Sequence, residues 1–239
     1  MIELKNPDFF SKAVGAIASF ISEGNFRFNE KGISFRAIDA SQIVLVDYFL
    51  PKKVFDKYKI EPSLVGLDLK ELDRIFSRAM QKDKLTIELA ESEIIISLEG
   101  DFSRHFTLPL MDLSEQDVNL PEPKEGAKVT MPARILKEGL KDAALFNSSI
   151  ILKVNGKDFF IEAKGSSGSF NASAKDKSVK VISKKDVVAK YSLNFLSAIV
   201  READNEQEIL LSFDDDSPML VTYPIGESEI KFYLAPMVL

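Results

Sequence analysis

Apolar residues follow two spacings along this chain, and the two spacings alternate. In four segments they recur every three to four positions, which predicts amphipathic helices over residues 8–21, 69–81, 133–146 and 193–204. Between these segments, apolar and polar positions alternate in runs rich in β-branched and aromatic residues. Those runs predict strands within 25–37, 42–50, 84–100, 104–110, 150–163, 167–175, 208–223 and 229–236. Each half therefore reads helix, strands, helix, strands, which predicts an α+β fold with antiparallel sheets and helices on one face.

The second half of the sequence repeats the first. Residues 69–89 align without a gap with residues 193–213. Looser matches join Ile33 to Phe159, Phe35 to Ile161 and Leu110 to Leu234. A repeat this long predicts two similar domains, over residues 1–110 and 127–239, rather than a short solenoid unit. Two similar domains in one chain suggest a symmetric assembly.

Residues 111–126 separate the two halves and differ from both. The segment is acidic, contains two prolines and has no helical or strand period, so it is expected to be an extended connecting loop. Val118 and Leu120 are apolar within this polar stretch. They either attach the loop to a sheet or contact another molecule.

Composition indicates an ordinary globular chain of 239 residues, with 45% hydrophobic and 28% charged residues. No apolar run reaches the roughly 20 residues of a membrane helix, and no secretory signal is expected at the start. The absence of cysteine excludes disulfides and thiolate metal sites. The net charge of −6 argues against nucleic-acid binding unless the positive charge is gathered in one place.

The positive charge does gather on the helical segments, on the side away from the apolar stripe. Helical spacing puts Lys12, Arg74, Arg78, Lys137, Lys141 and Arg201 on these polar faces. Glu71, Asp73, Glu138 and Asp142 flank them and dilute the charge. A single such lysine usually faces only water. If the four helices line one surface, however, that surface could follow DNA phosphates without reading sequence.

Motifs for catalysis are missing from the sequence. There is no Walker loop, no dinucleotide-binding glycine pattern and no HExxH zinc motif. His105, the sole histidine, falls in a strand-like run, and a hydrolase built on it is an unfavoured alternative. Asp214, Asp215 and Asp216 lie between two predicted strands, so a solvated turn is expected there rather than a metal site. We therefore expect a protein that is not an enzyme and needs no cofactor or metal.

Three segments carry a resemblance to a known family. Residues 32–51 (GISFRAIDASQIVLVDYFLP), 106–123 (FTLPLMDLSEQDVNLPEP) and 232–239 (FYLAPMVL) resemble archaeal and eukaryotic proliferating cell nuclear antigen, a replicative sliding clamp. The resemblance covers both halves, the connecting loop and the C-terminal tail. It implies two similar clamp domains per chain, assembled as a homotrimeric ring with helices lining a central hole and sheets outside. Some archaea build the ring from three different chains, so a heterotrimer is the alternative.

This resemblance also implies the partners and the place of action. The ring would encircle double-stranded DNA and bind DNA polymerase, a clamp loader, a flap endonuclease, DNA ligase and other proteins with a short clamp-binding motif. It would lie in the cytoplasm, with the nucleoid, in an archaeon, and in the nucleus in a eukaryote. No membrane partner is expected. A checkpoint-type clamp and a duplicated-domain scaffold that never meets DNA are the alternatives.

The resemblance assigns three surfaces to this chain. DNA-facing positions fall on Lys12, Arg74, Lys137 and Lys141, while Ala18 and Ala198 replace positions that are usually basic in eukaryotic relatives. The client surface matches Ile38, Gln42, Ile43, Val118, Leu120, Pro121, Pro218, Tyr233, Leu234, Ala235 and Pro236, and Met237 replaces a common basic residue. The subunit contact would join two edge strands through Phe102, Arg104, Phe106 and Leu108 on one side and Ser169, Phe170 and Ala172 on the other.

Overall fold

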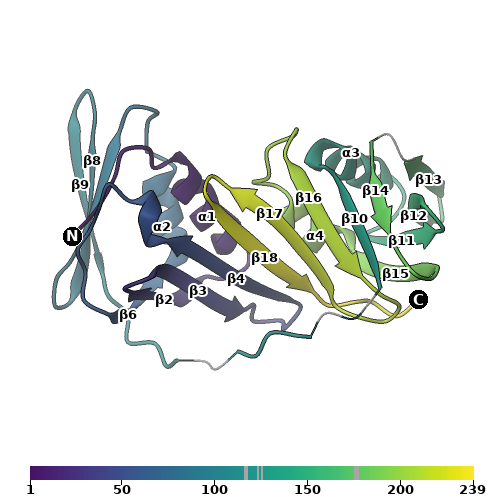
Figure 1. Cartoon of the computed structure of the whole chain (residues 1–239), viewed down its shortest axis with the longest axis horizontal. Helices are drawn as coiled ribbons and strands as arrows, with labels where there is room; N and C mark the ends of the chain where they lie inside the picture. The colour runs from purple at the N-terminus through teal and green to yellow at the C-terminus, as the bar shows by residue number, and fades with distance from the viewer. Residues whose placement is uncertain (116–117, 123, 125, 175–177) are drawn as a thin grey trace. The chain divides into compact units, whose positions relative to one another are not determined.

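The computed structural model describes the chain except residues 116–117, 123, 125 and 175–177, and it divides into two compact units (Figure 1). The first unit contains Met1–Ala40, Val46–Val118 and Ile225–Ile230. The second contains Ser41–Leu45, Asn119–Pro224 and Lys231–Leu239. Each unit is therefore built mainly from one half of the sequence and takes one short segment from the other half.

The first half of the chain forms two helices, and strands lie within each of the runs predicted from its alternating patterns. The elements are β1 (Ile2–Leu4), α1 (Asp8–Ala18), β2 (Glu23–Asn29), β3 (Gly32–Ile38), β4 (Val44–Pro51), a 3₁₀ turn η1 (Lys52–Val54), β5 (Lys57–Tyr58), β6 (Ser63–Asp68), α2 (Leu69–Phe76), β7 (Lys84–Leu89), β8 (Glu93–Glu99) and β9 (Ser103–Pro109).

The second half forms the matching set of elements. They are β10 (Ala127–Pro132), α3 (Ala133–Ala143), β11 (Ser149–Asn155), β12 (Asp158–Gly165), β13 (Gly168–Ala174), β14 (Lys180–Ile182), β15 (Val187–Ser192), α4 (Leu193–Ile199), β16 (Glu208–Phe213), β17 (Met219–Ile225) and β18 (Ser228–Leu234). In the described part of the chain, no helix is long and apolar enough to cross a membrane.

Strand order shows the same duplication. Neighbouring strands in the first half follow the order β5-β1-β7-β8-β9, and those in the second half follow β14-β10-β16-β17-β18. A second pair of orders, β4-β3-β2-β6 and β13-β12-β11-β15, also corresponds strand for strand. The recorded registers within these runs are antiparallel, as in β2 with β3 and β11 with β12. The predicted α+β class and the repeat are therefore confirmed.

The apolar stripes of the helices form the cores of the two units. α1 buries Phe10 and Ile17, and the Phe10 ring packs 5.3 Å from the ring of Phe76 on α2. In the second unit α3 lies so close to β12 that a Cβ on Gly139 would stand 2.7 Å from Cδ1 of Ile161. These contacts leave the opposite, polar sides of the helices exposed.

All four helices end earlier than their periodicity predicts, at residues 18, 76, 143 and 199 rather than 21, 81, 146 and 204. After α2 the main chain tightens, because Arg78 and Ala79 donate to carbonyls three residues earlier instead of four. Ala203 does the same after α4. Apolar spacing continues through these tighter turns, so it could not mark the helix ends.

Several short strands were missed by the sequence analysis. β1, β6, β10 and β15 each lead directly or almost directly into a helix; burial alternates along β1, β10 and β15, whereas β6 buries Val65, Gly66 and Leu67 in succession. In β6, for example, Asp68 ends the strand and its carboxylate accepts hydrogen bonds from the main-chain N–H groups of Lys70 and Glu71 at 2.9 and 3.0 Å. This acidic N-cap starts α2 immediately after the strand.

Candidate functional site

Two of the predicted DNA-facing cations in the first unit are paired with acids of their own helix. Lys12 Nζ lies 3.3 Å from a carboxylate oxygen of Asp8, four residues earlier. Arg74 lies 2.6 Å from Glu71, three residues earlier. Arg78 is exposed, lies beyond the end of α2 and forms no ion pair with the described residues. α1 and α2 pack side by side (Figure 1).

The second unit repeats this arrangement. Lys141 on α3 lies 2.7 Å from Glu138, and Arg201, beyond the end of α4, lies 2.9 Å from Glu202. α3 and α4 also contact each other. Four of the six predicted cations, Lys12, Arg74, Lys141 and Arg201, are therefore members of mixed-charge pairs, so the helices do not present a purely basic face.

Lys137 is placed differently from the other predicted cations. Its ammonium donates to the main-chain carbonyls of Arg201 at 3.0 Å and Ala203 at 2.6 Å, and so it caps the end of the α4 segment. Burial lowers the pKa of Lys137 below its usual value, although the charges of Glu202 and Asp204 act in the opposite direction. Lys137 therefore joins α3 to α4, a role that helical spacing did not reveal.

In the first unit, the predicted client residues Ile38 and Val118 line a hollow of about 500 Å³. The start of the connecting loop covers part of it and is fastened by two hydrogen bonds. Met111 donates its N–H to Gly66 O at 2.9 Å, and Asn25 Nδ2 donates to Leu113 O at 3.2 Å.

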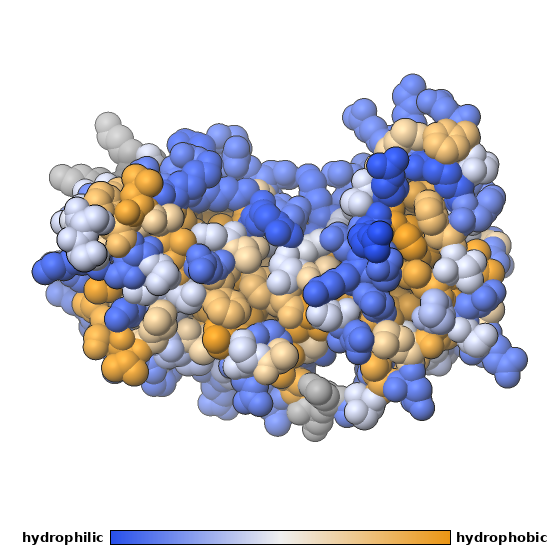
Figure 2. All heavy atoms as spheres, turned by 180° about the vertical axis from the view of Figure 1, so that it is seen from behind, coloured by the Kyte–Doolittle hydropathy of each residue, from blue (hydrophilic) through white to orange (hydrophobic). Residues whose placement is uncertain are grey.

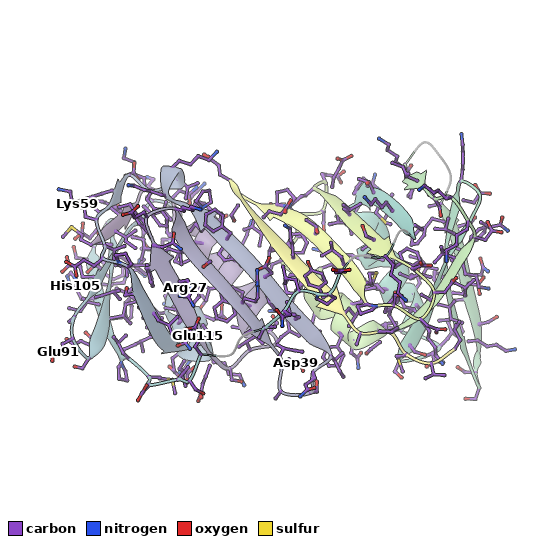
Figure 3. All side chains as sticks on the ribbon, turned by 60° about the horizontal axis from the view of Figure 1, so that its bottom comes forward. Arg27, Asp39, Lys59, Glu91, His105 and Glu115 are labelled. Carbon is purple, nitrogen blue, oxygen red and sulfur yellow. The ribbon has the colours of Figure 1, made fainter. Side chains whose placement is uncertain are left out.

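Ion pairs also line this hollow. Arg27 pairs with Glu115 of the loop, and Figure 3 shows the two labelled side chains meeting. Arg36 pairs with Asp47 at 2.9 Å. Sequence reasoning missed these four residues, because the partners are far apart along the chain. The hollow is consequently lined by both kinds of residue: apolar ones such as Ile38, Leu113 and Val118, and the charged members of these two ion pairs.

The other client residues lie in the second unit. Pro121, Pro218 and Tyr233 line a small hollow there. Ala235 donates its N–H to Ile43 O at 2.9 Å, which fixes the start of the tail.

Accessibility separates the remaining client residues. Leu234 is fully buried, so its side chain belongs to the core, while Leu120 and Pro236 are half-buried.

Gln42 is exposed and has a positive φ of 58°, a backbone conformation that non-glycine residues seldom adopt. Backbone strain of this kind occurs at binding sites and in tight turns, and the client role of Gln42 stays a prediction.

The aspartate run lies in the turn between β16 and β17, as expected, but it is not simply solvated. Asp214 is buried and pairs with Lys185 at 2.6 Å, and Asp215 pairs with the same ammonium at 3.3 Å. Burial alone would raise the pKa of Asp214, yet hydrogen bonds from Lys185 and the Asp215 N–H outweigh it and hold that pKa below its usual value. Among the described residues, no group of three or more His, Asp or Glu could hold a metal.

The two predicted contact strands, β9 and β13, each stand at the end of their strand order. Alternate side chains along both strands are exposed, and the residues between them, including Phe106, Leu108, Phe170 and Ala172, are half-buried. Ser169 is exposed. His105 lies on the β9 edge, where its Nδ1 is 2.9 Å from Ser97 Oγ. Both strands therefore have the half-open character of a sheet edge.

Phe102 and Arg104 are held in place at the start of β9. Phe102 is 57% exposed, and the guanidinium of Arg104 stacks 4.8 Å from its ring centroid. Arg104 also pairs with the fully buried Asp83 and donates to Arg78 O at 2.6 Å. Asp83 is a further residue that sequence reasoning missed.

Seen from behind, hydrophilic and apolar residues are interspersed over the surface (Figure 2).

Comparison with known proteins matches both halves of the chain to one family. The model described as "Proliferating cell nuclear antigen, N-terminal domain" matches residues 1–117, and the C-terminal domain model matches residues 119–238. The DNA polymerase sliding clamp 1 of Thermococcus kodakarensis is 32% identical over 235 residues, covering 96% of this chain and 94% of that protein. The DNA polymerase sliding clamp of Pyrococcus furiosus is also 32% identical, with the same coverage.

Solved structures agree with the sequence matches. A crystal structure of PCNA from Thermococcus kodakaraensis has a TM-score of 0.94 and 27% identity, and the match covers 99% of both chains. The Entamoeba histolytica protein has a TM-score of 0.91 at 21% identity, over 99% of this chain and 98% of that one, and supports the fold alone. With both domain models matched in order over nearly its full length, this chain belongs to the proliferating cell nuclear antigen family.

Proposed function

We propose that this chain is a DNA sliding clamp, a non-enzymatic protein that encircles duplex DNA and holds a replicative DNA polymerase on it. The observation that carries the proposal is the match of both clamp domains, in order, along a chain whose halves share one strand order. Relatives of nearly equal length are DNA polymerase sliding clamps. The compartment would be the nucleoid region of an archaeal cell or the nucleus of a eukaryotic one.

The assembly we propose is a ring of three copies. Because β9 and β13 are different strands of the same chain, pairing β9 of one copy with β13 of the next makes a head-to-tail contact that can close into a ring. Such pairing would also satisfy both open edges. Three different chains could make the same contact, so the oligomeric state has to be measured.

The client surface is proposed to combine the apolar residues of the loop and the tail. Half-buried Leu120, exposed Pro218 and the hollow beside Tyr233 offer apolar area for the anchors of a short helical motif. Polymerase, clamp loader, flap endonuclease and ligase are the partners expected to carry such a motif. If Leu120 is an anchor, Leu120→Ala should weaken a client peptide by roughly 1–3 kcal/mol in calorimetry. Unchanged affinity would remove Leu120 from the surface.

Light scattering and a processivity assay test the main proposal together. We expect the mass of three chains and longer extension products from the cognate polymerase when the clamp is loaded on primed DNA. Reversing one cation in each unit, as Arg74→Glu with Lys141→Glu, should shorten the products while the mass stays unchanged. Lys31→Glu with Lys157→Glu is the matched control, because both lysines are exposed in hairpin turns. Equal effects of the two doubles would contradict DNA contact at the helices, and a wild-type protein without any stimulation would refute the clamp.

A further inference from the structure

Most cations on the helix surfaces are compensated by a neighbouring acid. Lys12, Arg74 and Lys141 pair with acids three or four residues earlier in the same helix: Asp8, Glu71 and Glu138. Beyond α4, Arg201 pairs with the next residue, Glu202. Arg134 at the start of α3 likewise pairs with Glu206 at 3.0 Å. The same device thus occurs on helices of both units.

Little net charge is left on the helices themselves. α1 contains one acid and one base, and α2 contains two of each. α3 carries three bases and two acids, and α4 carries no charged residue. Lys137, one of the three bases, is committed to the main-chain carbonyls of Arg201 and Ala203. The helices themselves are therefore close to neutral, as the flanking acids in the sequence indicated, and Arg78 beyond α2 remains an exposed cation without an ion pair among the described residues.

Compensation of this kind changes how a surface meets DNA. Duplex DNA attracts a protein through the phosphates that the protein neutralises, and the salt dependence of binding reports their number. A cation already paired with a carboxylate must give up that partner, or share its charge, before it neutralises a phosphate. In the pairs of Arg74 and Lys141 both side chains are well exposed, so solvent screens them and a phosphate can displace the acid at small cost.

We propose that Glu71 and Glu138, together with Asp8 and Glu202, regulate how strongly the helix surfaces bind DNA. Each acid pairs with a cation that would otherwise neutralise a phosphate. The acids would lower the affinity of each contact and shorten its lifetime, so that a threaded duplex is held by topology and can move. This inference rests on the proposed clamp function and concerns how strongly the same surface holds DNA. It assigns to the acids an active role in sliding.

The decisive experiment uncovers one cation in each unit without changing side-chain shape. Glu71→Gln with Glu138→Gln raises the net charge by two and keeps good helix formers in place. The control, Glu30→Gln with Glu91→Gln, raises the net charge by the same two units. It uncovers no cation, because these exposed acids lie between strands and form no ion pair with the described residues. Binding of the full chain to a fluorescent duplex is measured by anisotropy at a series of NaCl concentrations.

Location, rather than total charge, should decide the outcome. For the helix double variant we expect the slope of log affinity against log salt to steepen by about one to two for each copy of the chain that contacts the duplex, since each uncovered cation contributes about 0.9. Its diffusion along DNA should slow in single-molecule tracking, and the control should match the wild type in both. Equal slopes for the two doubles would overturn the inference.

Failure of the inference and failure of the clamp function can be told apart by the wild type. If the wild-type chain stimulates the polymerase but the helix double variant keeps the wild-type salt slope, the acids have no regulatory role and the clamp function stands. If no form binds duplex and the wild type gives no stimulation, both are refuted. Circular dichroism melting of each variant shows that the comparison is made between folded proteins.

Discussion

The buried pair of Asp83 and Arg104 is the strongest single test of how the β9 edge is held. Asp83 is fully buried, and one carboxylate oxygen accepts from Arg104 and from the Met80 N–H at 2.7 Å. Arg104 is mostly buried, with 14% of its side chain exposed. Replacing Asp83 with Asn removes the negative charge and leaves a guanidinium in a site with little access to water.

The cost can be bounded from these contacts. Breaking a fully buried pair costs about 3–5 kcal/mol. Asn can still accept from Met80, and Arg104 keeps the Arg78 carbonyl and the Phe102 ring, so we expect about 2–3 kcal/mol for Asp83→Asn. For a chain of this size that corresponds to a fall of about 5–10 °C in melting temperature. Calorimetry at fixed protomer concentration measures it, because any assembly makes the transition concentration-dependent.

A double-mutant cycle separates the pair from its surroundings. Asp83→Asn with Arg104→Met removes both charges, and we expect the double to be more stable than the sum of the single effects by at least about 1 kcal/mol. Asp101→Asn, an exposed aspartate of the β8–β9 hairpin, should change stability by less than about 0.5 kcal/mol. Additive effects in the cycle, or an Asp83→Asn variant as stable as the Asp101→Asn control, would refute this account of the edge.

Three further changes test other contacts. Gly139→Ala should lower the free energy of unfolding by about 1 kcal/mol in urea, because the new Cβ meets Ile161 at 2.7 Å and the crowding exceeds the gain in helix propensity. A more stable variant would show that Ile161 moves aside. Asp214 has a lowered pKa, so its contribution to stability is present above its usual pKa and is lost as the pH falls through its pKa in the folded protein. Lys185→Met should therefore shift the midpoint of acid unfolding to higher pH, and an unshifted midpoint would contradict the pairing. Lys137→Met should speed amide hydrogen exchange after α4 and cost about 1–2 kcal/mol, whereas unchanged exchange would show that its carbonyl contacts are unimportant.

Periodicity was enough to predict the fold class and the duplication, because both depend on which face of each element is apolar. Residues 69–89 and 193–213 could be aligned from spacing alone, and the structure gives them equivalent elements, a helix followed by a strand. The ends of α2 and α4 could not be predicted. There the hydrogen bonds change from four-residue to three-residue spacing while apolar spacing continues.

Sequence separation explains which parts of the candidate site could be predicted. The compensation of Lys141 by Glu138 is visible in the sequence, since residues three apart share a helix face. The role of Lys137 is not, because its carbonyl partners lie more than sixty residues away. Asp83 is equally hidden. It reads as a polar loop residue until the fold buries it beneath Arg104.

The duplication is preserved in the fold but not in the surfaces, and this difference bears on function. Both units keep the same strand order and the same pairing of helix cations with acids, which suits contact with a duplex whose backbone looks alike to every unit. The client residues have no such repetition. The loop follows only β9, the last strand of the first half, and the tail follows only β18, the last strand of the second half. If the proposed surfaces are right, one chain would contact DNA through a surface that both units repeat, and would offer each client a single site.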